Sequence, residues 1–417
     1  MKQLKTFFIL WITQSLSALG SAMTAFAITL RLYEQTGSAL KTALLSVCSY
    51  APYIVMSIFA GALSDRWNKK ATMLVCDTFA ALCTLAVLML LKADALAAWH
   101  LYLLNALNGL MNTVQQPAAE TSMTLIIPKK YYQQTSGMQS FSRSLITILN
   151  PIIATAVFSL LGIEAVIYID LGTFALAFIA LLFFVKIPRI QHDTEEKEPL
   201  LDSAAAGLRY LKANGMILTL IIFMSGINLV SSAFDAVLPA FVLSAERGSK
   251  AALSAVSSCA GIAMLVGSIM VSAMKPPKNR VKVIYITMLI SMSTENFILA
   301  FTGSPILWCI GQFIGWLLVP VMSANLDVIM RTTIPVKMQG RVYSCRNTLQ
   351  FFTIPIGLLS GGAMVDNVCD PIIQGGSILH NVFPTGSAMM MFILAAAGTL
   401  HCLVFGKILS KYSFREE

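Results

Sequence analysis

The chain consists mainly of apolar segments of about 20 residues, and its positive charges are sorted between the gaps that separate these segments. We place 22 of the 29 Lys and Arg residues in alternate gaps, five in the other gaps, and two, Arg143 and Arg346, inside segments. Cytoplasmic loops of membrane proteins show this excess of Lys and Arg. Backbone groups in lipid need internal hydrogen bonds, so apolar segments of this length form helices. The pattern therefore predicts an all-α integral membrane protein with both termini and a long middle loop in the cytoplasm.

Charged residues are scarce, which excludes several classes of protein. The 417 residues are 57% hydrophobic and 12% charged, whereas a soluble domain has about 25% charged residues. Little sequence is left for a separate catalytic domain. The excess of Lys and Arg in the predicted cytoplasmic loops accounts for the net charge of +9, so we expect no nucleic-acid partner. The eight cysteines show no metal-ligand spacing, so we expect no metal site and no cofactor.

Twelve predicted spans form two groups of six, joined by a polar stretch. The first group covers residues 6–31, 41–63, 71–92, 99–122, 137–162 and 165–186. The second covers residues 215–243, 250–274, 282–302, 305–330, 341–365 and 385–410. Residues 187–214 are predicted to form a cytoplasmic linker with some amphipathic helix, and residues 366–384 an external loop. The predicted domains are therefore residues 1–186, the linker 187–214 and residues 215–417.

A short repeat relates the two groups of spans. Glu120 and Asp327 each stand eight positions before a proline, and Arg143 and Arg346 each stand six positions after a glycine. Two halves of the same orientation form a parallel repeat, which is typical of one large class of transporters. In each copy the acidic residue and the Arg lie on adjacent predicted helices near the cytoplasmic side. We interpret the pairs Glu120–Arg143 and Asp327–Arg346 as gating latches, and a permanent bridge between two helices is the alternative.

The loop between the second and third spans reads Gly61-Ala-Leu-Ser-Asp65-Arg66-Trp-Asn-Lys69-Lys70. A loop that only follows the charge bias needs its Arg and two Lys, but it does not need Gly61 or Asp65. The motif resembles the loop signature of the major facilitator superfamily. The resemblance extends over essentially the whole chain.

A second stretch, which runs from Ile334 through Gly340-Arg341 to Gly361-Gly362, is similar to the branch of that superfamily that holds macrolide-efflux and siderophore-export proteins. The resemblance implies two six-helix bundles around a central cavity, alternating access and proton-driven export. It also implies that Asp65 contacts the eleventh helix near Gly340 and Arg341 and stabilises one conformation.

Acidic residues inside the predicted spans are functional candidates, because a charge at the centre of a membrane helix costs at least about 2.5–3.5 kcal/mol. Asp235 lies in the seventh span, which the resemblance places at the cavity, and we predict that it exchanges protons. Glu295 lies in the ninth span, where proton coupling and a structural hydrogen bond are both open. Asp77 and Asp170 lie nearer the ends of their spans, and we interpret both as structural.

Amide and aromatic side chains of helices one, four, seven and ten would line the substrate cavity. These residues are Gln14, Asn105, Asn108, Asn112, Asn228, Phe234 and Gln312. Apolar walls with scattered amides suit an amphipathic organic solute better than a phosphate or a sugar acid, which need clustered Arg or Lys.

The sequence therefore predicts a transporter that acts with a small-molecule substrate in a lipid bilayer. The main hypothesis is a monomeric exporter of drug or macrolide type in a bacterial cytoplasmic membrane, with the proton gradient as its energy source. A siderophore or lysophospholipid carrier is the alternative, and a receptor that transports nothing is a third. The motifs HExxH and GxSxG are absent from the sequence, which argues against an intramembrane enzyme.

Overall fold

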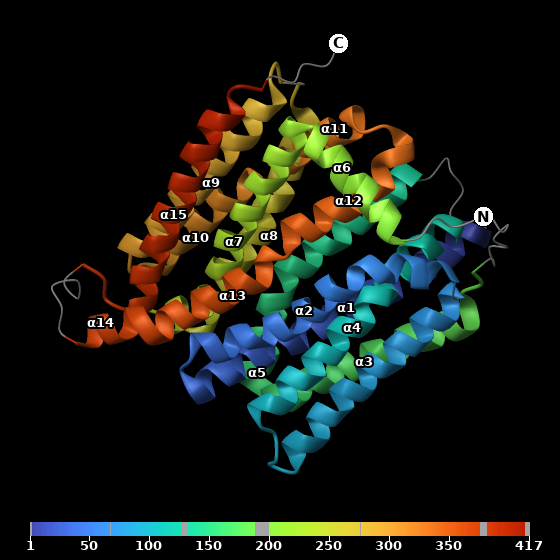
Figure 1. The fold of residues 1–417 in the computed structure, drawn as a ribbon. Coiled ribbons are helices and arrows are strands. Elements are labelled where there is room, and N and C mark those ends of the chain that lie inside the picture. The colour runs from blue at the N-terminus through green and yellow to red at the C-terminus, as the bar shows by residue number, and fades with distance from the viewer. Residues whose placement is uncertain are drawn as a thin grey trace. The chain divides into compact units, whose positions relative to one another are not determined.

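The computed structural model describes residues 2–66, 68–126, 132–187, 200–275, 277–375 and 382–412. These residues form helices joined by short turns, with no strand among them (Figure 1). The chain divides into two compact units. Unit 1 comprises Met1–Gly37 and Leu44–Asp193, and unit 2 comprises Ser38–Ala43 and Thr194–Glu417. The predicted domain boundaries stay a prediction.

Unit 1 is built around the packing of α1 against α5 and of α3 against α4. Fully buried side chains such as Phe7, Leu10 and Ile167 fill its core. Its helices are α1 (Lys2–Thr36), the larger part of α2 (Ala39–Arg66), α3 (Lys69–Lys92), α4 (Ala98–Ile126), α5 (Tyr132–Ile179) and the π-helical turn η2 (Ala180–Phe184).

Gly162 divides α5 into two helical segments. Its φ of 81° lies in the left-handed region, which residues with a Cβ adopt at a cost and glycine adopts freely. The 48 residues of α5 are far more than one membrane crossing needs. The break lies where the sequence analysis separates the spans 137–162 and 165–186.

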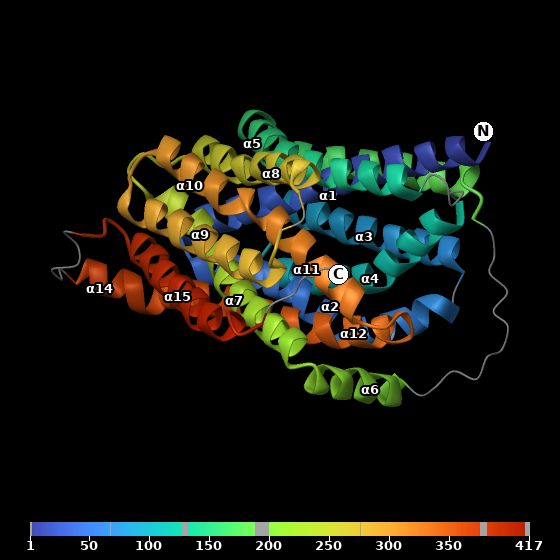
Figure 2. The ribbon, with the colours of Figure 1, turned by 90° about the horizontal axis from the view of Figure 1, so that it is seen from above.

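Unit 2 packs α15 against α9 and α7, and α10 against α8 (Figure 2). It also packs α13 against α7. The linker helix α6 packs on α12, and the Tyr210 hydroxyl donates a 3.0 Å hydrogen bond to the Thr333 carbonyl at the end of α11. The helices are α6 (Leu200–Ala213), α7 (Gly215–Ser244), α8 (Lys250–Ala273), α9 (Arg280–Phe301), α10 (Pro305–Leu317), α11 (Val319–Thr333), α12 (Val336–Phe351), α13 (Thr353–Met364), η3 (Val365–Cys369), α14 (Asp370–Gln374) and α15 (Gly386–Leu409).

Among the described residues, nine helical segments are long and apolar enough to cross a membrane. Large apolar side chains cover the outer surface of these helices: Leu160 is 82% exposed and Ile306 is 73% exposed. Lipid is the solvent that such a surface requires. The chain is a multi-pass membrane protein.

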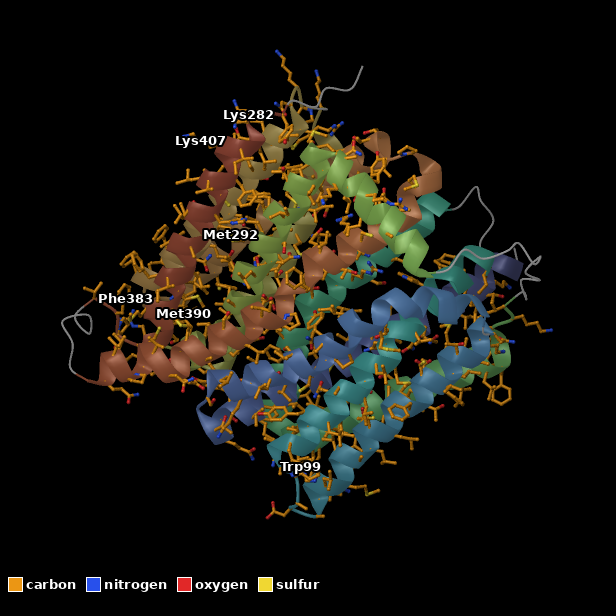
Figure 3. All side chains as sticks on the ribbon, viewed as in Figure 1. Trp99, Lys282, Met292, Phe383, Met390 and Lys407 are labelled. Atoms are coloured by element: carbon orange, nitrogen blue, oxygen red, sulfur yellow. The ribbon has the colours of Figure 1, made fainter. Side chains whose placement is uncertain are left out.

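Charged and apolar side chains separate along the length of unit 2. Lys282 of α9 and Lys407 of α15 lie together at one end, and Phe383 and Met390 lie at the other end, with Met292 between them (Figure 3). Lys side chains at one end and an aromatic residue at the other are typical of helices that end at the two surfaces of a bilayer.

Two predicted spans are interrupted in the structure. The span 305–330 divides into α10 and α11 at Leu318, and the span 341–365 divides into α12 and α13 at Phe352. Pro320 and Pro355 follow these breaks; each lacks the N–H that would continue the helical hydrogen bonds. The predicted external loop 366–384 begins instead as helix, and Cys369, expected in that loop, is fully buried in η3.

Candidate functional site

Lys70 of the loop motif connects two helix ends in unit 1. Its Nζ donates hydrogen bonds to the carbonyls of Leu182, at 2.9 Å, and of Val185, at 2.8 Å. A cation is favoured at these carbonyls because the carboxyl end of a helix carries partial negative charge. Asn68 caps α3 by accepting from the backbone N–H of Lys70.

Less of the structure is described for the other residues of the two motifs. Lys69 is buried at the start of α3. Gly61, Asp65 and Arg66 belong to α2, and Gly340 and Arg341 belong to α12. The structure describes only the helical backbone of these five residues and not their side chains, so the contact predicted for Asp65 stays a prediction.

One of the two predicted gating pairs lies within electrostatic range. Asp327 of α11 attracts Arg346 of α12, and Arg346 Nε donates a 3.1 Å hydrogen bond to Gln350 Oε1 one turn further along α12. In the other pair, Arg143 is exposed on α5, whereas the side chain of Glu120 lies outside the described residues. The structure thus brings the second pair together and leaves the first as a prediction.

Asp77 binds three helices of unit 1 together. The Gln115 amide of α4 donates to Asp77 Oδ1, and the Gln14 amide of α1 donates to Oδ2 at 3.4 Å. Gln14, which the sequence analysis assigns to the substrate cavity, is therefore engaged with a buried carboxylate.

Asp170 of α5 has a similar environment, in which its hydrogen-bond donors lie on α1 and α3. Its Oδ1 accepts from the Ser21 hydroxyl at 3.0 Å, and its Oδ2 accepts from the Thr84 hydroxyl at 3.5 Å. Since charge-assisted hydrogen bonds from several helices stabilise a buried carboxylate, both aspartates are well suited to the structural role that we expect.

The asparagines predicted to line the cavity differ in their exposure and in whether they have hydrogen-bond partners. Asn105 donates to Leu101 within its own helix, at 2.9 Å, and Asn112 is exposed. The buried Oδ1 of Asn108 has no hydrogen-bond partner in the described part of the chain. In unit 2, Asn228 donates to the Gln350 carbonyl at 2.9 Å. Phe234 is buried, with 4% of its surface exposed.

Asp235 and Glu295 are a pair of carboxylates in unit 2 whose charges repel each other. Asp235 of α7 is exposed, whereas Glu295 of α9 is 5% exposed. Glu295 packs directly on Gly315 of α10, which has no side chain to exclude it. The structure therefore brings together the two residues that the sequence analysis selects as proton-coupling candidates.

Polar side chains inside apolar helices are typical of membrane transporters, and comparison with known proteins leads to the same conclusion. The family model described as "Major Facilitator Superfamily" matches residues 10–358. The chain belongs to this superfamily. Major facilitator proteins are transporters, so this chain is a transporter and not an enzyme.

Relatives of the chain within the superfamily include efflux proteins. Macrolide efflux protein A of Streptococcus pyogenes is 23% identical over 370 residues, which cover 87% of this chain and 90% of the relative. Multidrug efflux pump Tap of Mycolicibacterium fortuitum is 21% identical over 360 residues, which cover 83% and 86%. A solved bacterial homologue of the human lysosomal transporter Spinster has a TM-score of 0.73 at 12% identity, and the match covers 100% of this chain and 99% of that one. This last likeness shows a shared fold.

The structure of this major facilitator transporter also contains a contact that sequence reasoning missed. The carboxylate of Asp366 in η3 accepts hydrogen bonds from the backbone N–H groups of Ala39 and Leu40, both at 3.1 Å, and from the hydroxyl of Ser38. It therefore caps the first turn of α2, the part of that helix that groups with unit 2. Ser38 before a helix is a recognisable capping signal, but nothing in the sequence points to a partner 328 residues away.

Proposed function

We propose that this transporter is a proton-coupled exporter of hydrophobic or amphipathic small molecules, of drug or macrolide type. Relatives named as macrolide and multidrug efflux proteins, with more than 80% of the chain aligned, support the substrate class. The observation that carries the proposal is Asp235, an exposed carboxylate within the 30-residue apolar helix α7. A charged group costs several kcal/mol inside a membrane helix. A carboxylate that gains and loses a proton during transport can couple the movement of solute to the proton gradient.

The proposed mechanism is alternating access between two six-helix bundles. Twelve crossings result if the two segments of α5 cross separately, while α10 with α11 and α12 with α13 each cross once. Both termini and the linker would then lie in the cytoplasm of a bacterial cell. Asp235 would take up a proton when it faces the outside and release it when it faces the cytoplasm, and the downhill proton would drive solute outward.

The pairs Asp327–Arg346 and Glu120–Arg143 are proposed to latch the cytoplasmic ends of their helices in one conformation. The electrostatic attraction between Asp327 and Arg346 supports the first of these. A permanent bridge predicts that charge reversal of Asp327 lowers stability, and that the double swap with Arg346 restores it without changing the transport rate. A latch predicts that the transport rate changes in the single variant.

A siderophore or lysophospholipid carrier on the same scaffold is the alternative function. Asn108, whose buried Oδ1 is unpaired within the described residues, and the exposed Asn112 suit either kind of solute, since amides bind neutral polar groups. The choice between these functions therefore depends on measuring transport of each solute.

The decisive experiment follows export of a fluorescent hydrophobic dye and of a macrolide from bacterial cells that express the chain. We expect export that a protonophore abolishes and that Asp235→Asn reduces at least tenfold. The matched control is Glu246→Gln, an exposed acidic residue shortly after α7, which should export like the wild type. Export that persists in Asp235→Asn, or that ignores the protonophore, contradicts the proposed coupling.

A further inference from the structure

The break between α10 and α11 is a one-residue turn at Leu318, whose backbone N–H donates to the Trp316 carbonyl. α10 ends at Leu317, and Pro320 lies in the first turn of α11. Because proline has no N–H, Pro320 cannot donate the helical hydrogen bond to the Trp316 carbonyl four residues earlier. The carboxyl end of a helix carries unsatisfied carbonyl oxygens and partial negative charge. An interrupted membrane helix of this kind is where transporters coordinate sodium ions or protons.

Glu295 of α9 lies against this helix end. A Cβ at Gly315 would collide with the Glu295 carboxylate, so the glycine makes the close approach possible. The hydroxyl of Ser291, one turn before Glu295, donates a 2.6 Å hydrogen bond to the Gly315 carbonyl. A carboxylate is thus packed beside partial negative charge, which is unfavourable unless a proton or a cation neutralises it.

Glu295 has the Trp316 indole as a neighbouring donor, but one oxygen of Glu295 and the amide oxygen of Gln312 remain unpaired among the described residues. Oε1 of Glu295 and Oε1 of Gln312 are both buried and have no hydrogen-bond partner in the described part of the chain. Their side chains are 5% and 3% exposed. Gln312 lies one turn before Trp316, whose indole ring is beside Glu295, so both α10 side chains share the face toward α9. An unpaired buried polar group costs about 1–3 kcal/mol, and a charged one costs more.

We propose that Glu295, Gln312 and the last carbonyls of α10 bind a small monovalent cation, Na⁺. Carboxylate and amide oxygens are the ligands that hard cations prefer. A proton would satisfy one oxygen, whereas a metal ion accepts electron pairs from several oxygens at once. The single charge of Glu295 matches a monovalent ion, and the low exposure of Glu295 and Gln312 excludes an organic solute.

The bound ion would also act on Asp235. The two carboxylates repel each other, and Na⁺ beside Glu295 removes that repulsion. Asp235 then remains the group that carries the proton. Only this consequence rests on the proposed function; the cation site itself does not depend on what the protein exports.

Binding of ²²Na⁺ to the purified full chain in detergent, without any ion gradient, tests the site. We expect saturable binding that unlabelled NaCl displaces, and a melting temperature that rises with NaCl but not with choline chloride. Glu295→Gln should weaken binding at least tenfold. Asp77→Asn is the matched control, because Asp77 is a buried carboxylate with two amide donors in unit 1, and it should bind Na⁺ like the wild type.

Gln312→Leu provides a second variant if Glu295→Gln does not fold. It removes one neutral ligand and leaves the charge, so we expect roughly tenfold weaker binding. The site is refuted if the wild type shows no saturable Na⁺ binding, if the Glu295 and Gln312 variants bind like the wild type, or if Asp77→Asn loses binding equally. Failure of dye export in cells, with Na⁺ binding intact, would count against the proposed function alone.

Discussion

The buried carboxylates of the two units differ in how well their hydrogen bonds are satisfied. In unit 1, Asp77 and Asp170 each accept two hydrogen bonds from side chains of other helices. In unit 2, Glu295 has an oxygen without a donor among the described residues, and it repels Asp235. A carboxylate surrounded by donors holds helices together whether or not transport occurs. A carboxylate without them favours the binding of a cation, and this contrast separates structural charges from functional ones.

The largest effect that tests this contrast is expected from Asp77→Leu. The substitution removes the acceptor for the amides of Gln14 and Gln115 and leaves both of these partly buried donors unpaired. At about 1–3 kcal/mol for each unpaired group, the loss of stability is about 2–6 kcal/mol. Thermal unfolding of the purified protein in detergent measures it. Asp77→Asn keeps an acceptor oxygen and should lose much less; equal losses in the two variants would contradict the structural role.

Glu295→Leu should change the stability in the opposite direction to Asp77→Leu. In buffer without sodium, replacing Glu295, whose buried Oε1 has no donor among the described residues, by an apolar side chain removes an unfavourable contribution of about 1–3 kcal/mol. We therefore expect a melting temperature equal to or above that of the wild type, together with loss of its dependence on NaCl. A fall as large as that of Asp77→Leu would show that Glu295 is as fully hydrogen-bonded as the carboxylates of unit 1.

Much of the fold was predictable from the sequence, because a long apolar segment in lipid has no alternative to a helix. The linker helix α6 lies within the stretch where an amphipathic helix is expected. The break of α5 at Gly162 also coincides with a predicted gap between spans. The interruption of α10 and α11 was not predicted, since apolar residues continue through Leu318 and hide the effect of Pro320.

The partners of individual side chains were much harder to predict. Gln14 was assigned to the cavity, but it donates to Asp77. When a helix is apolar on every side, the sequence does not indicate which face meets a neighbouring helix. The proximity of Asp235 and Glu295, and the cap that Asp366 places on α2, depend on tertiary packing between segments far apart in the chain.

Gly315→Ala tests the environment of Glu295 by adding a methyl group beside it without changing any charge. The added methyl group collides with Glu295, and overpacking costs about 1–3 kcal/mol, of which the better helix propensity of Ala returns about 1 kcal/mol. The net loss should be between 0 and about 2 kcal/mol, with weaker Na⁺ binding. Gly172→Ala is the control, because its Cβ would meet nothing within 4 Å. Similar melting temperatures for the two variants would show that Glu295 can move away from α10.

The smallest effect is expected at Lys70, the motif residue whose contacts the structure describes most fully. Lys70→Met keeps most of the aliphatic chain but removes the two hydrogen bonds to the carboxyl end of η2. The group is partly exposed, so water replaces part of the interaction, and the loss of stability should be about 1 kcal/mol or less. Lys70→Arg should restore it, and Lys275→Met, at an exposed position after α8, should leave the melting temperature unchanged. If Lys70→Met also melts like the wild type, water satisfies these carbonyls equally well, and Lys70 then serves only the charge bias of its loop.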